Sequence, residues 1–104
     1  MKYLKKKLII DGFNTENLAK KYSTPLYLYS LKTIKENILN FKGNFKKVDP
    51  LICFAVKANP NKTLLNEIGK LDLGADVVSM GELMKALKSG IKPNKIVFSG
   101  VGKT

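Results

Sequence analysis

Lys57 is the side chain of this 104-residue chain whose surroundings most clearly suggest chemistry. It directly follows residues 51–56, the most apolar run of the sequence. A lysine with apolar neighbours is partly desolvated, which favours its neutral amine, and a neutral amine is the form that condenses with a carbonyl group. Two carboxylates follow: Asp76 lies inside the next apolar run, and Glu82 lies just beyond it.

All three residues also have a structural interpretation. With so many lysines in the chain, one will often follow a strand by chance. Ser79 and Glu82 have the spacing of a capping box, in which the two side chains satisfy N–H groups of a helix's first turn. Asp76 could pair with a lysine at the edge of a sheet. For the two carboxylates, the local pattern favours these structural roles.

The composition excludes several kinds of site. The chain has 19 basic and 8 acidic side chains and a net charge of +11, and every basic residue is lysine. Without histidine or arginine it has no His-based acid/base group, His-bearing metal site or Arg clamp on phosphate. Its single cysteine, Cys53, excludes an internal disulfide and a Cys-cluster zinc site, and its mid-strand position favours a core role. We expect no metal.

The glycine-rich end of the sequence is not a P-loop. Residues 100–104 (GVGKT) end in Gly-Lys-Thr, but Val97 stands where that motif needs its first glycine.

The distribution of charge and hydrophobicity bears on partners and location. Outside residues 5–7 the lysines are scattered, which is typical of solvated surfaces, so we expect no nucleic-acid partner. Residues 8–10 are too short an apolar run for a signal peptide, and Asp11 and Gly12 interrupt it. We therefore expect no membrane association, and the lone cysteine favours the cytoplasm.

Four apolar segments predict strands that alternate with helices. They begin at residues 26, 51, 75 and 96 and cover residues 26–29, 51–56, 75–78 and 96–98. Three helices fill the gaps, with caps at Ser30 and Asn61 and a closing Gly90. Their apolar stripes are Leu31, Ile34, Ile38 and Phe41; Leu64, Leu65, Ile68 and Leu71; and Leu83, Met84 and Leu87. A strand over residues 3–10 and a short helix capped at Asn14 or Thr15 precede them, and Pro25 ends that helix.

This alternation predicts an α/β fold with a parallel sheet, either doubly wound or a (β/α)8 barrel. The chain shows about three and a half βα units. It has no G-x-G-x-x-G after the first strand, which counts against a dinucleotide-binding fold. Function in such folds gathers at the carboxyl ends of the strands, which here selects residues 57–61, 79–82 and 99–104. Because no helix follows the last strand, we expect an N-terminal piece of a longer protein.

Four segments, in order, resemble the pyridoxal-phosphate-dependent barrel decarboxylases of the alanine-racemase type. They are residues 24–29 (TPLYLY), 54–61 (FAVKANPN), 74–83 (GADVVSMGEL) and 95–104 (KIVFSGVGKT). The third is most similar to the diaminopimelate decarboxylases. Alanine racemases have a Tyr-Gly pair where this chain has Pro60 and Asn61, and ornithine and arginine decarboxylases have a different third strand. Ser23 and Met80 stand where the family commonly has glycine.

The resemblance implies a fold and a cofactor. Residues 25–104 would form the N-terminal part of a pyridoxal-phosphate-binding (β/α)8 TIM barrel, and residues 1–24 a lead-in of one strand and a short helix. Lys57 would hold pyridoxal 5'-phosphate as a Schiff base. Asp76 and Glu82 would lie beside Lys57 and tune its protonation.

The resemblance also implies a reaction, the decarboxylation of meso-2,6-diaminopimelate to L-lysine and carbon dioxide by a full-length homodimer. The 104-residue chain alone would be inactive, because the family's remaining cofactor and substrate residues lie further along. Two alternatives stay open. One is a barrel decarboxylase for ornithine, arginine or carboxynorspermidine, and the other is a non-catalytic, decarboxylase-like regulator.

Overall fold

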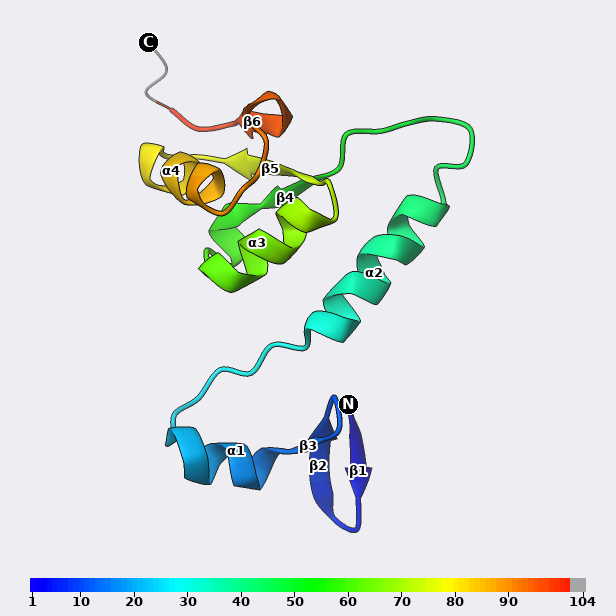
Figure 1. The fold of residues 1–104 in the computed structure, drawn as a ribbon, viewed down its shortest axis with the longest axis vertical. Coiled ribbons are helices and arrows are strands. Elements are labelled where there is room, and N and C mark those ends of the chain that lie inside the picture. Colours follow the sequence, from blue (N-terminus) through cyan, green and yellow to red (C-terminus); the bar gives the residue numbers. More distant parts are fainter. Residues whose placement is uncertain (102–104) are drawn as a thin grey trace. The chain divides into compact units, whose positions relative to one another are not determined.

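The computed structural model describes residues 1–101, and the chain divides into two compact units, Met1–Lys46 and Lys47–Thr104. Each unit has its own sheet (Figure 1). The division differs from the predicted boundary after residue 24, because residues 25–46 group with the first unit. That boundary, which refers to a complete barrel domain, stays a prediction.

The sheet of the first unit is antiparallel, with the order β1-β2-β3. Its strands are β1 (Lys2–Leu4), β2 (Lys7–Ile10) and β3 (Phe13–Asn14). The prediction of one strand over residues 3–10 is wrong: Lys5 and Lys6 form a tight turn, both with positive φ, and the segment folds back as a hairpin. Turns with φ above zero at both central residues match the twist of a hairpin. Among residues 1–101, none of these three strands pairs with the parallel sheet of the second unit.

The two helices of the first unit begin at the predicted caps. The side chain of Asn14 accepts a hydrogen bond from the Glu16 N–H (2.9 Å) at the start of α1 (Thr15–Tyr22). Ser30 accepts one from the Thr33 N–H (3.1 Å) at the start of α2 (Leu31–Gly43). α1 ends before Pro25, as predicted.

The strand predicted over residues 26–29 is not formed. These residues connect α1 to α2, and no segment among residues 1–101 forms a hydrogen-bonded β-ladder with them. Tyr27 is 85% exposed and Tyr29 is 51% exposed. A strand exists only where a neighbour accepts and donates its backbone hydrogen bonds, and apolar character alone does not supply that neighbour.

The second unit contains the predicted parallel sheet, with the order β4-β5-β6. Its elements are β4 (Cys53–Ala55), the 3-10 turn η1 (Val56–Ala58), α3 (Lys62–Lys70), β5 (Gly74–Val77), α4 (Met80–Lys88), the 3-10 turn η2 (Pro93–Lys95) and β6 (Ile96–Phe98). β4 is shorter than the strand predicted over residues 51–56. At its carboxyl end the backbone turns into η1 at Val56, and at its amino end Leu51 is half exposed and outside the strand. The α/β class with a parallel sheet is confirmed.

The core of the second unit lies between the sheet and its two helices. Its buried apolar side chains are Val56, Leu64, Leu65, Ile68, Leu73, Ala75, Val77, Ala86 and Ile91. The α3 stripe is as predicted, but the α4 stripe is wrong: Ala86 is fully buried, whereas Met84 and Leu87 are exposed. A small side chain lets this helix lie close to its neighbours, so the larger ones point away.

The other face of the same sheet carries a different set of side chains. Successive residues of a strand point to opposite faces, so Cys53, Ala55, Asp76 and Val97 share the face opposite the buried set. Val97 is 46% exposed, and the other three are half-buried. This second face is called the open face below. Among residues 1–101, no helix has the length and apolar character needed to cross a membrane.

Candidate functional site

The candidate residues meet at one edge of the parallel sheet. Because β4, β5 and β6 are parallel and in register, Lys57, Ser79 and Ser99 all follow the carboxyl ends of their strands. Asp76 is in register with Ala55, two residues before Lys57. The prediction that Lys57 shares this edge with Asp76 and Glu82 is confirmed. Of the predicted segment 99–104, residues 102–104 lie outside the described residues.

Lys57 combines a fixed backbone with an accessible side chain. It is the central residue of η1, directly after the fully buried Val56, and the Asn59 N–H donates to the Val56 carbonyl (3.1 Å). The side chain of Lys57 is exposed and has no ion pair or hydrogen bond with residues 1–101. The predicted desolvation is therefore wrong for this part of the chain, because the turn carries the amine out of the core.

Asp76 is held by a serine from the neighbouring strand's end. The Ser99 hydroxyl donates a hydrogen bond to Asp76 Oδ1. Among residues 1–101 no lysine pairs with Asp76, so the alternative of a lysine partner is not seen in this part of the chain. The Asp76 carboxylate also acts on Cys53 on the same face: burial raises the pKa of the Cys53 thiol, and the nearby negative charge raises it further. A thiol with a raised pKa is a poor nucleophile at neutral pH, consistent with a core role.

Glu82 forms a variant of the predicted capping box. Ser79 Oγ accepts a hydrogen bond from the Glu82 N–H (3.2 Å), as the box requires. The Glu82 carboxylate reaches back to the N–H of Val78 (2.8 Å), one residue before the usual position. Glu82 Oε2 is thus fixed at the start of α4, where the positive end of the helix dipole stabilises its charge.

Sequence reasoning missed the partner of Asp76. From the sequence, Ser99 is only one member of the predicted segment 99–104 at the edge of the sheet. Its position two residues after Val97, which is in register with Asp76, places it on the open face. The next residue, Gly100, approaches β5 so closely that a Cβ there would lie 2.1 Å from the Val78 carbonyl oxygen. The Ser99–Asp76 contact and the close approach at Gly100 both depend on the strand register, which cannot be read from a single sequence.

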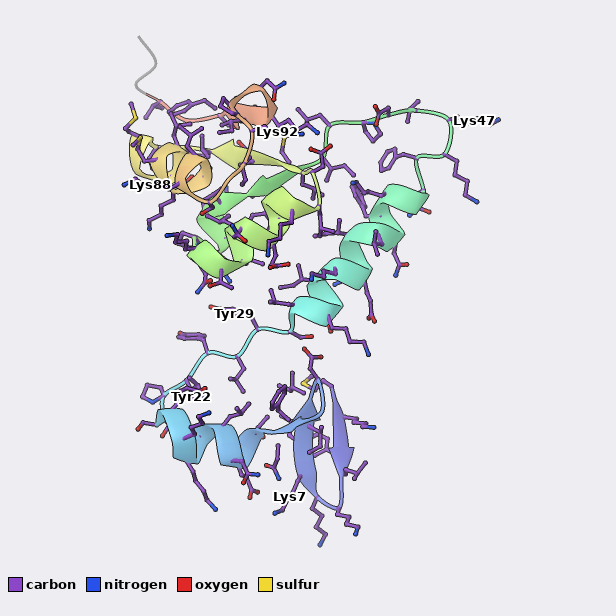
Figure 2. The ribbon with its side chains drawn as sticks, in the orientation of Figure 1. Lys7, Tyr22, Tyr29, Lys47, Lys88 and Lys92 are labelled. Atoms are coloured by element: carbon purple, nitrogen blue, oxygen red, sulfur yellow. The ribbon has the colours of Figure 1, made fainter. Side chains whose placement is uncertain are left out.

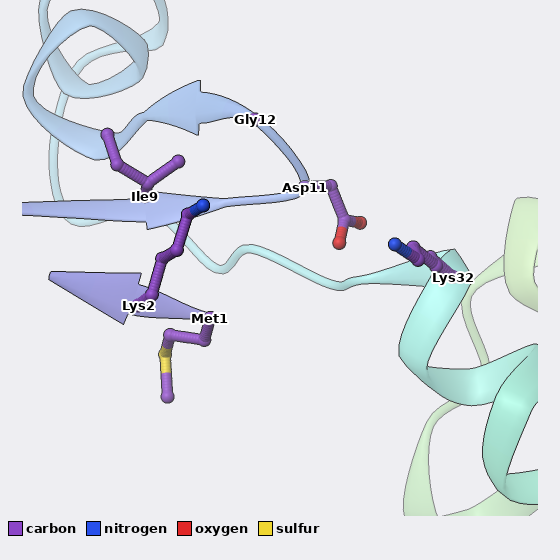
Figure 3. A pocket seen from close by; sticks show the side chains of 6 residues that line it. All are labelled: Met1, Lys2, Ile9, Asp11, Gly12 and Lys32. Carbon is purple, nitrogen blue, oxygen red and sulfur yellow. The ribbon is translucent and has the colours of Figure 1, made fainter. Parts of the chain in front are cut away.

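The first unit has a separate pocket that contains none of the candidate residues. It is lined by Met1, Lys2, Ile9, Asp11, Gly12 and Lys32. The Lys32 and Asp11 side chains point toward each other across it (Figure 3), and the Asp11 carboxylate accepts a hydrogen bond from the Ser30 hydroxyl (2.8 Å). Asp11 therefore ties the turn after β2 to the first turn of α2, which is a structural role.

The positive charge of the chain is spread widely. Lysines such as Lys7, Lys47, Lys88 and Lys92 project from different elements (Figure 2). The closest grouping of opposite charge lies around Asp72, which pairs with Lys92 (2.9 Å) and Lys95 (2.8 Å). Asp72 precedes β5, so this cluster is at the amino end of the strand and away from Lys57.

The sheet edge therefore offers an accessible primary amine and two oriented carboxylates. An amine of this kind bonds covalently to an aldehyde, and neighbouring carboxylates stabilise positive charge on nitrogen. These residues fit a carbonyl-bearing cofactor. Within residues 1–101, no three Cys, Asp or Glu side chains are grouped as they would be around a metal ion.

Comparison with known proteins extends this picture. Residues 31–104 match the family described as "Pyridoxal-dependent decarboxylase, pyridoxal binding domain". A diaminopimelate decarboxylase from Helicobacter pylori is 54% identical over 92 residues, covering 88% of this chain and 23% of that protein. The Aquifex aeolicus diaminopimelate decarboxylase is 47% identical over 104 residues, covering the whole chain and 24% of that protein.

Solved structures give the same result. The crystal structure of the Helicobacter pylori diaminopimelate decarboxylase with L-lysine matches 88% of this chain and 23% of its own, with a TM-score of 0.81 and 52% identity. The enzyme from M. jannaschii, also with L-lysine, matches 94% of this chain and 24% of its own, with a TM-score of 0.89 and 39% identity. The chain thus spans about a quarter of the length of the relatives it matches.

Proposed function

This chain belongs to the pyridoxal-dependent decarboxylases, and from that premise we propose that the full-length protein decarboxylates meso-2,6-diaminopimelate to L-lysine and carbon dioxide. The family's cofactor is pyridoxal 5'-phosphate. The observation that carries the proposal is Lys57: an accessible amine, on a fixed turn, at the carboxyl edge of a parallel sheet.

In this proposal Lys57 binds the cofactor covalently through Nζ. The cofactor, when bound, supplies an electron sink for the carbanion left by the departing carbon dioxide. Asp76 faces the same side of the sheet as the residues leading to Lys57, and its carboxylate stabilises positive charge at this edge. Glu82 Oε2, which accepts a hydrogen bond from the Val78 N–H (2.8 Å), supplies a second, oriented negative charge at this edge.

The choice of substrate rests on the relatives. The proteins matched at 40–54% identity are named diaminopimelate decarboxylase, and three matched structures contain L-lysine, the expected product. These names support diaminopimelate over ornithine, arginine or carboxynorspermidine. We further propose that the full-length protein is a cytoplasmic homodimer, as its resemblance to this family implies.

The test uses the full-length protein and the substitution Lys57→Arg. A guanidinium keeps the charge but is too weak a nucleophile to bond to the cofactor at neutral pH. We expect loss of the visible absorbance of lysine-bound cofactor, and a fall in carbon dioxide release from meso-diaminopimelate by about three or more orders of magnitude. In the unsubstituted protein, borohydride reduction should fix the cofactor's mass on the peptide that contains Lys57.

Lys62→Arg is the matched control, because Lys62 is exposed in the first turn of α3 and should change neither readout. Normal absorbance and turnover in the Lys57→Arg protein would refute the role of Lys57. Faster release from ornithine, arginine or carboxynorspermidine would refute the substrate. Cofactor bound at Lys57 without turnover of any of these amino acids would instead identify a regulator.

A further inference from the structure

Ser99 is the one hydrogen-bond partner of the Asp76 carboxylate among residues 1–101. We propose that Ser99 is a positioning residue of this site, which holds the Asp76 carboxylate in one orientation at the edge that carries Lys57. The inference rests on the proposed function, because it gives Asp76 a place beside the cofactor lysine.

The contact joins two separate strands through fixed backbone. Val97 is in register with Asp76, and Ser99 lies two residues further along the same face. The Ser99 N–H donates to the Val77 carbonyl (2.9 Å), which extends the β5–β6 ladder by one step beyond β6. The hydroxyl therefore reaches Asp76 diagonally from a backbone that is itself held by the neighbouring strand.

The residue after Ser99 restricts the geometry further. At Gly100 a Cβ would lie 2.1 Å from the Val78 carbonyl oxygen, so only glycine allows the chain to approach the end of β5 this closely. This approach brings the Ser99 hydroxyl within reach of Asp76. Ser99 thus donates the hydrogen bond, and Gly100 allows the close backbone approach that brings the Ser99 hydroxyl to Asp76.

The hydroxyl decides which way the carboxylate points. The terminal torsion of an aspartate is broad, so without a donor the carboxylate rotates. No lysine pairs with Asp76 among residues 1–101, and Glu82 is bound elsewhere, to the Val78 N–H. Removing the Ser99 hydroxyl therefore leaves the direction of the Asp76 carboxylate unset while the residue itself stays in place.

The test compares Ser99→Ala, which removes the donor, with Ser99→Thr, which keeps it, in the full-length holoenzyme. For Ser99→Ala we expect kcat to fall about tenfold and the cofactor dissociation constant to rise about fivefold, as when a hydrogen bond to a charged group is lost. Ser99→Thr should restore both to within about twofold. Ser89→Ala is the matched control, since it also removes a hydroxyl in this unit, but one that is buried and without a partner among residues 1–101.

A double-mutant cycle separates positioning from a merely structural role. In an Asp76→Ala background, which removes the acceptor of the Ser99 hydroxyl, Ser99→Ala should have no further effect on kcat or on cofactor binding. An equal loss in both backgrounds, or an unchanged Ser99→Ala holoenzyme, would overturn the proposal.

The same cycle, measured by thermal unfolding of the cofactor-free protein, tests the contact without any activity. We expect Ser99→Ala to lower the melting temperature only when Asp76 is present. Absence of this coupling overturns the proposal whatever the cofactor does. If the coupling is present and unsubstituted protein binds cofactor at Lys57, an unaffected Ser99→Ala enzyme refutes positioning but leaves the proposed function standing. A protein that binds no cofactor at Lys57 refutes both.

Discussion

Lys57 combines an anchored backbone with an accessible side chain. Its neighbour Val56 is fully buried, which fixes the turn, while its own side chain is exposed and has no partner among residues 1–101. The two carboxylates nearby are each bound by one donor, Asp76 by a hydroxyl and Glu82 by a backbone N–H. The amine lies at the same sheet edge as these two carboxylates, and a primary amine is the group that bonds to a carbonyl cofactor.

Asp72 gives a residue-level prediction about pH. Its hydrogen bonds and charge attraction to Lys95 and Lys92 lower its pKa from 3.8 to about 2. Because the pKa is lowered in the folded state, Asp72 contributes stability above pH 3.8, and that contribution is lost as the pH falls toward 2. We expect Asp72→Asn to lower the urea midpoint near pH 6 and to make a progressively smaller difference as the pH falls toward 2.

Salt provides the control for this pair of contacts. Asp72 is exposed, so at about 1 M salt the difference between the two proteins should shrink at every pH. Turnover at neutral pH should stay unchanged, because Asp72 lies at the amino end of β5, opposite the edge that carries Lys57. A difference that grew as the pH fell would contradict the assignment.

At the scale of single residues, the position of the candidate side chains at one sheet edge was more predictable from the sequence than their hydrogen-bond partners were. Lys57, Asp76 and Glu82 stand in short motifs, and their shared edge follows from the parallel alternation of strands. The hydrogen bond from Ser99 to Asp76 joins residues 23 positions apart, so it depends on register and on the close approach at Gly100. The exposure of Lys57 depends on the turn that follows β4, which the apolar run of residues 51–56 concealed.

The helices of the second unit owe their ends to specific residues. Asn61 accepts a hydrogen bond from the Leu64 N–H (3.1 Å) at the start of α3, as predicted. At the end of α4, the Gly90 N–H donates to the Leu87 carbonyl and the Ile91 N–H to the Ala86 carbonyl. These two hydrogen bonds are those of a Schellman motif, and the side chains of Ile91 and Ala86, where that motif has its apolar pair, are both buried.

Gly90→Ala tests the end of α4. Gly90 has φ +89°, and a Cβ there would meet no atom within 4 Å, so the cost is that of the backbone alone. We expect a loss of about 1–2 kcal/mol in the free energy of unfolding, measured by urea denaturation.

Gly81→Ala is the matched control in the same helix. Its Cβ would lie 3.8 Å from Ser79 Oγ, an ordinary contact, and alanine favours helix more than glycine does. We expect equal or greater stability. If the two substitutions had equal effects, the left-handed conformation of Gly90 would not be what limits stability.

Elements were predictable where a pattern and a cap agree, as for α2, α3 and the three strands of the parallel sheet. The errors arose where tertiary neighbours decide. Residues 26–29 are apolar, but no strand among the described residues pairs with them. In α4 the buried residue is Ala86 and not the predicted Met84 and Leu87, because close packing selects the small side chain. The hairpin at Lys5 and Lys6 was missed because lysine is an unusual residue at positive φ.

At the scale of the whole molecule, the chain spans about a quarter of its relatives' length, so the relatives contain many residues that have no counterpart in it. The open face of the parallel sheet carries Asp76 and leads to Lys57, yet Val97 on the same face is 46% exposed. If the proposed full-length protein closes this sheet into a barrel, we expect the open face to be covered, since closed barrels fill their interior with side chains.

A polypeptide limited to residues 1–104 should lack the proposed activity. It contains no arginine and no histidine, so it lacks the side chains that most often clamp a phosphate or stack and transfer protons at a cofactor ring. Its Lys57 amine is exposed, without the enclosure that excludes water from a reacting centre. We expect no release of carbon dioxide from meso-diaminopimelate and no saturable cofactor binding, with the full-length protein as the positive control. Turnover by this polypeptide that Lys57→Arg abolished would show that the amine and its two carboxylates suffice, and that the rest of the enzyme only increases the rate.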